Sequence, residues 1–160
     1  MGSELKTLLI LAGGKEAISG IKIARKMGLN VVVVDGNANA PGRQYCNHFI
    51  QANIYDPDET LNSVKEFSKH KTIDGVITIA ADNPISVAKV AKMLNLESLS
   101  MKTATLSTNK VLMKDEFKKN GIPIPFYKAI YKKSEIEEIL LERPGKYVLK
   151  PIDSRGSRGV

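Results

Sequence analysis

Three runs of apolar residues divide the first part of the chain at regular intervals. They cover residues 7–12, 30–34 and 75–81, and each is followed directly by glycine or aspartate. Runs that are apolar on both faces are typical of strands in a parallel sheet that helices cover on its two sides. A weaker apolar run at 48–52 predicts a further strand of the same sheet.

Helical patterns lie between and after these runs. Apolar residues recur at helical spacing over residues 16–27, 58–69 and 84–94. Gly28 is a natural end for the first helix, and Pro84 is a natural start for the third. Strand and helix alternate about every 25 residues, which predicts βαβ units with right-handed crossovers. We therefore expect an α/β fold with a Rossmann-like parallel sheet.

The alternation changes after about residue 99. A helix is predicted over 105–120 and strands over 126–131 and 147–149. A helix over 134–141 lies between the two strands, with Ser134 as its cap and Glu137 completing a capping box. We place a boundary near residues 100–104.

Two domains follow from that boundary. Residues 1–103 are expected to form the Rossmann-like domain. Residues 104–160 are expected to form a linker helix and the beginning of a smaller α+β domain.

Composition narrows the class of protein without naming a function. Of the 160 residues, 42% are hydrophobic and 26% are charged, as in ordinary soluble globular proteins. No apolar run approaches the roughly 18–20 residues of a membrane span, and the N-terminus does not have the pattern of a signal peptide. The one cysteine, Cys46, excludes an internal disulfide and indicates a reducing compartment. We expect a cytoplasmic protein with no membrane partner.

The net charge of +7 raises the alternative of a basic nucleic-acid-binding module. The lysines, however, are scattered over predicted helix faces without an arginine-rich block or interleaved aromatic residues. We expect no specific nucleic-acid partner.

Gly13 and Gly14, in the turn after the first strand, form the first candidate site for a substrate. Ligands of open α/β sheets gather at the carboxyl ends of the strands. A dinucleotide fingerprint would read G-x-G-x-x-G, whereas the glycines here fall at 13, 14 and 20. Asp35 still ends the second strand at the spacing known from NAD-binding proteins. An NAD(P)-dependent oxidoreductase is therefore kept as an alternative, and so is a purely structural tight turn.

Arg43 and Asp82 are further candidates for substrate binding in loops that leave the same ends of the strands. Arg43 could hold a carboxylate or a phosphate, or it could be an ordinary surface arginine. Asp82 could orient a polar substrate, or it could cap the helix that follows.

Lys110 and Lys150 are candidates for binding an anion. On the predicted helix, Lys110 lies on the apolar side with Met113 and Phe117, where an ammonium must reach water or an anionic partner. Lys150 ends a predicted strand and precedes a glycine- and serine-rich loop. A Walker A loop has its lysine after the glycines, so this is a different kind of phosphate loop.

Four segments taken together resemble the ATP-grasp superfamily, in particular the ligases related to the carbamoyl-phosphate synthase large subunit and to biotin carboxylase. The segments cover residues 9–14, 35–42, 108–125 and 148–160. The resemblance implies a pre-ATP-grasp domain followed by an ATP-grasp domain in two lobes. The family often has Asp-Lys where this chain has Asn109 and Lys110, and Arg155 stands where a smaller residue is usual.

The resemblance also implies an activity. Such enzymes are ATP-dependent carboxylate–amine ligases, or ligases with a similar nucleophile, and act through an acyl-phosphate intermediate. The ATP-binding residues that it implies here are Lys110, Lys150, Ser154, Gly156, Ser157 and Gly159. The Mg²⁺ ligands are expected after residue 160, so no metal site is expected within the chain. No catalytic residue is assigned.

These implications set the expected partners and the remaining alternatives. The substrates would be a small-molecule carboxylate and a nucleophile, and the oligomeric state is open, a homodimer included. Residues 1–160 alone are expected to be inactive and to bind ATP weakly. A non-catalytic nucleotide-binding scaffold is the third alternative.

Overall fold

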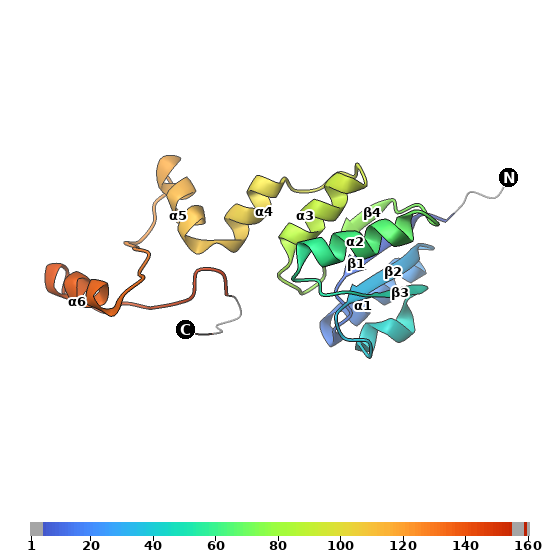
Figure 1. The fold of residues 1–160 in the computed structure, drawn as a ribbon, viewed down its shortest axis with the longest axis horizontal. Coiled ribbons are helices and arrows are strands. Elements are labelled where there is room, and N and C mark those ends of the chain that lie inside the picture. The colour runs from blue at the N-terminus through green and yellow to red at the C-terminus, as the bar shows by residue number, and fades with distance from the viewer. Residues whose placement is uncertain (1–4, 155–158, 160) are drawn as a thin grey trace. The chain divides into compact units, whose positions relative to one another are not determined.

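The chain divides into two compact units, Met1–Ala104 and Thr105–Val160. The structure is a computed structural model that describes residues 5–154 and 159 (Figure 1). Of these residues, none belongs to a helix long and apolar enough to cross a membrane.

The first unit is built on one sheet of four parallel strands in the order β3-β2-β1-β4. In the register of the sheet, Leu8 of β1 lies between Val31 of β2 and Gly75 of β4. The parallel α/β fold predicted from the apolar runs is confirmed. The strands are β1 (Thr7–Leu11), β2 (Asn30–Asp35), β3 (His48–Gln51) and β4 (Gly75–Ile77).

Helices pack on both faces of this sheet because its central strands are apolar on both faces. The short turn η1 (Lys15–Ala17) and helix α1 (Ile18–Lys26) cover one face, and a second short turn, η2 (Pro41–Tyr45), contacts them. Helices α2 (Pro57–Ser68) and α3 (Pro84–Met93) cover the opposite face. The helix predicted to begin at residue 16 begins at Ile18, because residues 15–17 form the short 3-10 turn η1.

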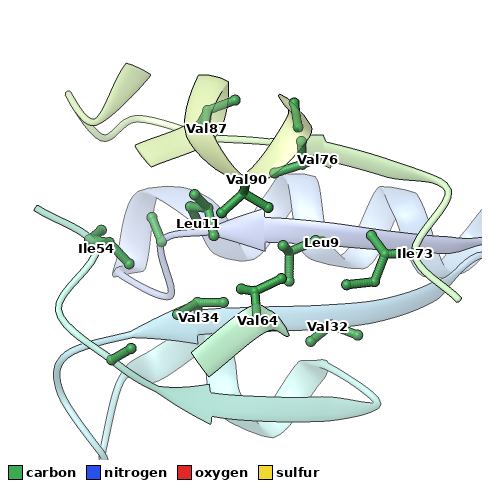
Figure 2. Packing of buried hydrophobic residues seen from close by; sticks show 13 residues of the cluster. Leu9, Leu11, Val32, Val34, Ile54, Val64, Ile73, Val76, Val87 and Val90 are labelled. Atoms are coloured by element: carbon green, nitrogen blue, oxygen red, sulfur yellow. The ribbon is translucent and has the colours of Figure 1, made fainter. Parts of the chain in front are cut away.

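Alternate residues of one strand serve two separate cores. Ile10 packs with Ile21 of α1 on one face of the sheet. Leu9 and Leu11 point to the other face and pack with Val90 of α3 (Figure 2). All of these side chains are fully buried, so the sheet is held from both sides.

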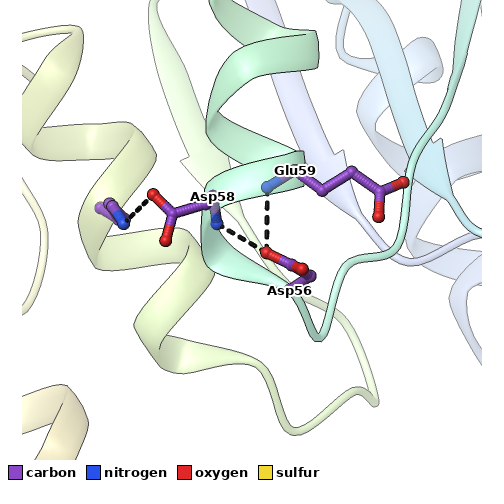
Figure 3. A network of polar contacts seen from close by, with 4 residues as sticks. Asp56, Asp58 and Glu59 are labelled. Atoms are coloured by element: carbon purple, nitrogen blue, oxygen red, sulfur yellow. Dashed lines mark hydrogen bonds and ion pairs between the residues drawn. The ribbon is translucent and has the colours of Figure 1, made fainter.

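The start of α2 is fixed by a side-chain cap. Asp56 Oδ1 accepts hydrogen bonds from the backbone N–H groups of Asp58 and Glu59 at 2.9 and 3.0 Å (Figure 3). Asp58 in turn pairs with Lys89 of α3 at 2.6 Å. The cap satisfies two backbone donors that have no partner inside the helix, and the ion pair joins the two helices of this face.

The first two helices that follow residue 100 are shorter than predicted. The expected helix over 105–120 is wrong as a single element, because Asn109 is extended (φ −100°, ψ 111°) and separates α4 (Met101–Thr108) from α5 (Lys110–Lys119). The Asn109 side chain accepts from the backbone N–H groups of Val111 and Leu112, each at 3.0 Å. An asparagine that caps a new helix ends the previous one.

The start of α6 (Lys133–Glu142) also differs from the prediction. Its N-cap is Lys132, one residue before the helix, and Ser134 is already helical. The carboxylate of Glu135, not that of Glu137, accepts from the backbone N–H groups of Tyr131 and Lys132 at 2.6 and 3.0 Å. The predicted capping box was therefore displaced by two residues.

The two strands predicted for the second unit are wrong. Residues 126–131 and 147–149 are not strands in the structure, although the rings of Phe126 and Tyr147 touch. A strand is held by a ladder of backbone hydrogen bonds, and none joins these two segments among the described residues. Within 105–154, Ile139 is the one buried side chain, so this unit has little core of its own.

Candidate functional site

A cavity in the second unit brings together the two lysines predicted to bind ATP. Lys110, the first residue of α5, and Lys150 both line a cavity of about 750 Å³. That volume lies within the range of small-molecule sites, roughly 300–1,000 Å³. Three more lysines line the same cavity: Lys114, Lys128 and Lys146.

The charge of this cavity is of one sign. Its lining has five lysines and no carboxylate, and the remaining lining side chains are apolar or aromatic. An excess of ammonium groups beside apolar walls favours a ligand that combines several negative charges with a flat apolar part. Sequence reasoning missed Lys114, Lys128 and Lys146, because only the tertiary fold shows that they lie around one space.

Lys110 is fixed by hydrogen bonds at both ends of the residue. Its backbone N–H donates to the carbonyl of Ile152 at 3.0 Å. Its Nζ donates to the same carbonyl at 3.2 Å and also to the carbonyl of Ser154. The side chain is half-buried, and its ammonium is held by these two backbone carbonyls.

The first backbone donors of α5 are already occupied. Lys110 N–H bonds to Ile152, and the next two N–H groups bond to the Asn109 side chain. The N-terminus of this helix therefore has no free donor in its first three residues to offer to a phosphate. The lysine side chains are then the charged donors that the cavity lining offers to an anion.

Aromatic residues form one wall of the cavity. The rings of Phe126 and Tyr147 meet edge to face, with 6.1 Å between their centroids. The guanidinium of Arg143 lies 4.7 Å from the centroid of Phe126, and Tyr147 Oη donates to the carbonyl of Arg143 at 2.6 Å. These contacts hold the segments of Phe126 and Tyr147 together without a β-ladder.

A hydrogen bond to a carboxylate fixes the neighbouring Tyr127. Its hydroxyl donates to Asp115 Oδ1 at 2.5 Å, and this bond raises the pKa of Tyr127 above its ordinary value. Lys114 lies 5.3 Å from the centroid of the same ring. Tyr127 thus joins α5 to the segment that follows it.

The loop after Lys150 is described in part. Ser154 lies at its start, where its carbonyl accepts from Lys110. Gly159 has a φ of +75°, and a Cβ there would lie 2.9 Å from Cγ of Pro151, so only glycine fits. Gly156 and Ser157, which the sequence also assigns to ATP binding, lie outside the described residues.

In the first unit, both backbone polar groups of Gly13 make hydrogen bonds within the protein. Its backbone N–H donates to Asp35 Oδ2 and its carbonyl accepts from Gly42 N–H, both at 2.7 Å. A Cβ on Gly13 would lie 3.0 Å from that of Ala40 and 3.1 Å from Cγ1 of Val33. This turn needs glycine because two loops and a strand meet at it.

Gly14 and Arg43 have different surroundings. Gly14 precedes η1 and has an ordinary φ of −64°, and a Cβ there would meet only Oε2 of Glu16. Arg43 donates to the carbonyl of Ala38 at 2.6 Å and lies 4.8 Å from the ring centroid of Phe49. Those contacts hold the Arg43 side chain against its own loop and β3.

Asn83, the residue after Asp82, has a buried side chain at the start of α3. The N-cap of α3 is Asn83, so the interpretation of Asp82 as the cap is wrong. Asn83 is 4% exposed and donates through Nδ2 to the carbonyl of Leu11 at 3.2 Å. Its Oδ1 is buried and has no hydrogen-bond partner in the described part of the chain. The sequence motif contained Asn83, but nothing in it distinguished Asn83 from Asp82.

A metal site is not formed by the residues that the structure describes. Among them, no three His, Cys, Asp or Glu side chains are grouped so that they could hold an ion. The cavity lining agrees with this, since it contains lysines and no oxygen ligands from carboxylates.

The parallel sheet with helices on both faces gives the first unit an α/β fold. Residues 21–97 match the family model of the ATP-grasp N-terminal domain. The predicted resemblance to the ATP-grasp superfamily is confirmed, and the first unit has the fold of the N-terminal domain of ATP-grasp ligases.

Two curated relatives are similar in sequence. One is a formate-dependent phosphoribosylglycinamide formyltransferase of Prochlorococcus marinus, 21% identical over 96% of this chain and 39% of its own length. The other is an N5-carboxyaminoimidazole ribonucleotide synthase of Staphylococcus epidermidis, 34% identical over 56% of this chain and 22% of its own length.

Two solved structures extend the likeness to the fold. Phosphoribosylglycinamide synthetase from Anaerococcus prevotii has a TM-score of 0.71 and 26% identity, over 87% of this chain and 35% of its own. N5-carboxyaminoimidazole synthetase from Staphylococcus aureus, complexed with ADP, also has a TM-score of 0.71, at 18% identity over 97% of this chain and 41% of its own. The chain therefore spans about two fifths or less of the length of each of these four relatives.

Proposed function

We propose that the chain is the N-terminal portion of an ATP-dependent ligase that joins a small-molecule carboxylate to an amine or a similar nucleophile through an acyl phosphate. One observation carries this proposal. Lys110 and Lys150, which the family resemblance implies as ATP ligands, line the same cavity. In this proposal residues 1–103 form the pre-ATP-grasp domain, and residues 104–160 contain the linker helix and the start of the ATP-grasp domain.

The residues of the cavity fit a nucleotide polyphosphate. Five ammonium groups can neutralise the charge of the phosphates, and the apolar and aromatic wall can cover a base. Because the first amides of α5 are occupied, this binding depends on side-chain charge rather than on the helix end. When bound, ATP would supply the phosphoryl group that activates the carboxylate, and the lysines would position it.

Magnesium is part of the proposal but not of this cavity. Its ligands are oxygens, and the cavity lining has no carboxylate. We infer that Mg²⁺ would be held by residues after 160 together with the phosphates. A cytoplasmic location, a small-molecule substrate pair and a homodimer belong to the same proposal.

Four residues of the first unit are candidates for binding the carboxylate or the nucleophile, and the structure does not support them equally. Gly13 and Arg43 make contacts within the protein that would account for them without a ligand. Gly14 and Asp82 remain candidates at the carboxyl ends of β1 and β4. The nucleophile and the carboxylate themselves stay unnamed.

The narrower likeness to carbamoyl-phosphate synthase and biotin carboxylase remains a proposal too. The relatives named above are a formyltransferase and synthetases of phosphoribosylglycinamide and of N5-carboxyaminoimidazole ribonucleotide. Their names favour a ligase that acts on a small molecule, which is the coarser form of the same prediction.

The NAD(P)-dependent oxidoreductase and the non-catalytic scaffold predict different ligands or activities. An NAD(P)-dependent oxidoreductase would use the Asp35 carboxylate for a ribose, yet both oxygens of Asp35 accept backbone N–H groups. A fluorescence titration with NADH would test that alternative directly. A non-catalytic scaffold would bind ATP in the same cavity without turning it over.

Binding of MgATP to lysine variants tests the proposal. In the full-length ligase, Lys110→Met and Lys150→Met should each weaken MgATP binding at least tenfold by isothermal titration. Lys133→Met is the matched control, because Lys133 is an exposed lysine of the same unit outside the cavity. Unchanged affinity in both cavity variants would contradict the assignment.

A second measurement tests whether tight ATP binding requires residues outside 1–160. Residues 1–160 alone should be inactive and should bind ATP weakly, because the metal ligands are proposed to lie outside them. Tight, magnesium-dependent binding of ATP by residues 1–160 would contradict this part of the proposal.

A further inference from the structure

We propose that Lys110 is a positioning residue as well as a ligand of the nucleotide: it holds the turn at Ile152–Ser154 and thereby places Lys150 at the cavity. This inference rests on the proposed function for the identity of the ligand. The contacts that carry it involve only residues of α5 and the segment after Lys150.

The ammonium of Lys110 has three donors, and two of them are already in use. Nζ donates to the carbonyls of Ile152 and Ser154, which are two residues apart. Carbonyls at that spacing converge on one ammonium only if the backbone turns around it. At most one donor of Lys110 is then left for a phosphate oxygen.

The backbone of Lys110 adds a second link to the same turn. Its N–H donates to the carbonyl of Ile152 at 3.0 Å, so that carbonyl accepts from both the backbone and the side chain of one residue. The first N–H groups of a helix have no partner inside the helix. The turn at Ile152 therefore completes the start of α5, and α5 fixes the turn.

Lys150 differs from Lys110 in the contacts of its side chain. It lies two residues before Ile152 and lines the same cavity, but it is exposed, and no described contact ties its side chain to the turn. Two lysines of one cavity are thus expected to have different roles. Loss of Lys150 should remove a charge, whereas loss of Lys110 should remove a charge and release the segment that carries Lys150.

Amide hydrogen exchange in the full-length protein without nucleotide separates these roles. Lys110→Met should accelerate exchange of the residue-110 amide at least tenfold, because its acceptor Ile152 is no longer held. Lys150→Met should leave that rate within twofold of the wild type. Lys110→Arg keeps both charge and donors and should restore most of the protection.

The amides of Val111 and Leu112 serve as internal references, because they bond to the Asn109 side chain and not to the turn. In Lys110→Met, these two amides should keep their exchange rates. An equal acceleration at all three amides would mean general unfolding of α5 and would overturn the proposal. An unchanged rate at residue 110 would overturn it as well.

Nucleotide binding is measured separately on the same three variants. If Lys110→Met accelerates exchange at residue 110 but neither methionine variant weakens MgATP binding, the positioning role stands and the proposed function fails. If both variants weaken binding and neither changes exchange, the proposed function stands and the positioning role is wrong.

Discussion

The backbone N–H of Gly13 donates to Asp35 Oδ2 across 2.7 Å and so joins the turn after β1 to the end of β2. The other carboxylate oxygen of Asp35 accepts from Asn37 N–H at 2.9 Å. The carbonyl of Gly13 accepts a hydrogen bond from the backbone N–H of Gly42. Because these groups satisfy one another, the polar groups of the Gly13 backbone have partners within the protein itself.

Asp35→Ala should therefore destabilise the first unit. Gly13 is buried, and the substitution leaves its N–H without an acceptor, which typically costs about 1–3 kcal/mol. Asp35→Asn should also destabilise, since an amide has one oxygen where two N–H groups need acceptors. Urea unfolding of the chain measures both effects.

The matched control is Asp58→Asn, which removes a carboxylate from an exposed ion pair with Lys89. Its cost should stay within about 1 kcal/mol, as for other surface pairs. Equal unfolding midpoints for Asp35→Ala and Asp58→Asn would show that the Gly13–Asp35 bond contributes little.

The second prediction concerns the close approach at Gly42. A Cβ there would lie 2.7 Å from Cδ1 of Ile21 and 2.9 Å from the Gly13 carbonyl oxygen, which is backbone and cannot rotate away. Gly42→Ala should cost about 1–3 kcal/mol, as overpacking does. Gly36→Ala is the control, because its nearest atom would be 3.7 Å away. Thermal unfolding should separate the two variants, and similar midpoints would contradict the packing argument.

The sequence predicts the first unit well for a definite physical reason. A strand buried on both faces must be apolar throughout, and residues 7–12 and 30–34 have that pattern with little ambiguity. The third run was predicted to reach residue 81, but β4 ends at Ile77. Thr78 then bonds through its hydroxyl to the carbonyl of Leu11, and Ala80 has a φ of +54°, so the chain turns before its apolar run ends.

The second unit was less predictable, because its local signals depend on partners. The apolar segment at 147–149 has the composition of a strand, yet a strand exists only where a neighbour forms the ladder. Asn109 reads as an ordinary polar residue within a helix until its side chain is seen to cap α5. Lys110 and Lys150 could be found from the resemblance, whereas the shared cavity required the fold.

The third prediction is a pH dependence at the start of α6. The pKa of Glu135 lies below its ordinary value, chiefly because Tyr131 N–H and then Lys132 N–H donate to its carboxylate. A carboxyl group whose pKa is lowered by folding stabilises the folded form above its unfolded pKa, about 4.3. That contribution is lost as the pH falls through the lower folded value.

An NMR titration of the Tyr131 and Lys132 amides measures this effect. Both resonances should move together toward unstructured positions as the pH falls below the ordinary glutamate pKa of about 4.3 and through the lower folded value. Glu137→Gln is the control, because Glu137 has only a long 3.8 Å pair with Lys133 and should leave the titration unchanged. In Glu135→Gln the carboxyl titration itself should vanish. A wild-type profile in Glu135→Gln would assign the transition to another group.

The last prediction follows from the unequal cores of the two units. The first buries complete apolar layers on both faces of its sheet, whereas Ile139 is the one buried side chain among the described residues of 105–154. Folding must offset a backbone entropy cost of about 1–2 kcal/mol per residue, which one buried side chain does not supply. Residues 1–104 alone should unfold cooperatively in urea with the midpoint that they have in the whole chain. Residues 105–160 alone should show no cooperative transition, and a sharp one would mean that this unit has a source of stability beyond the packing seen here.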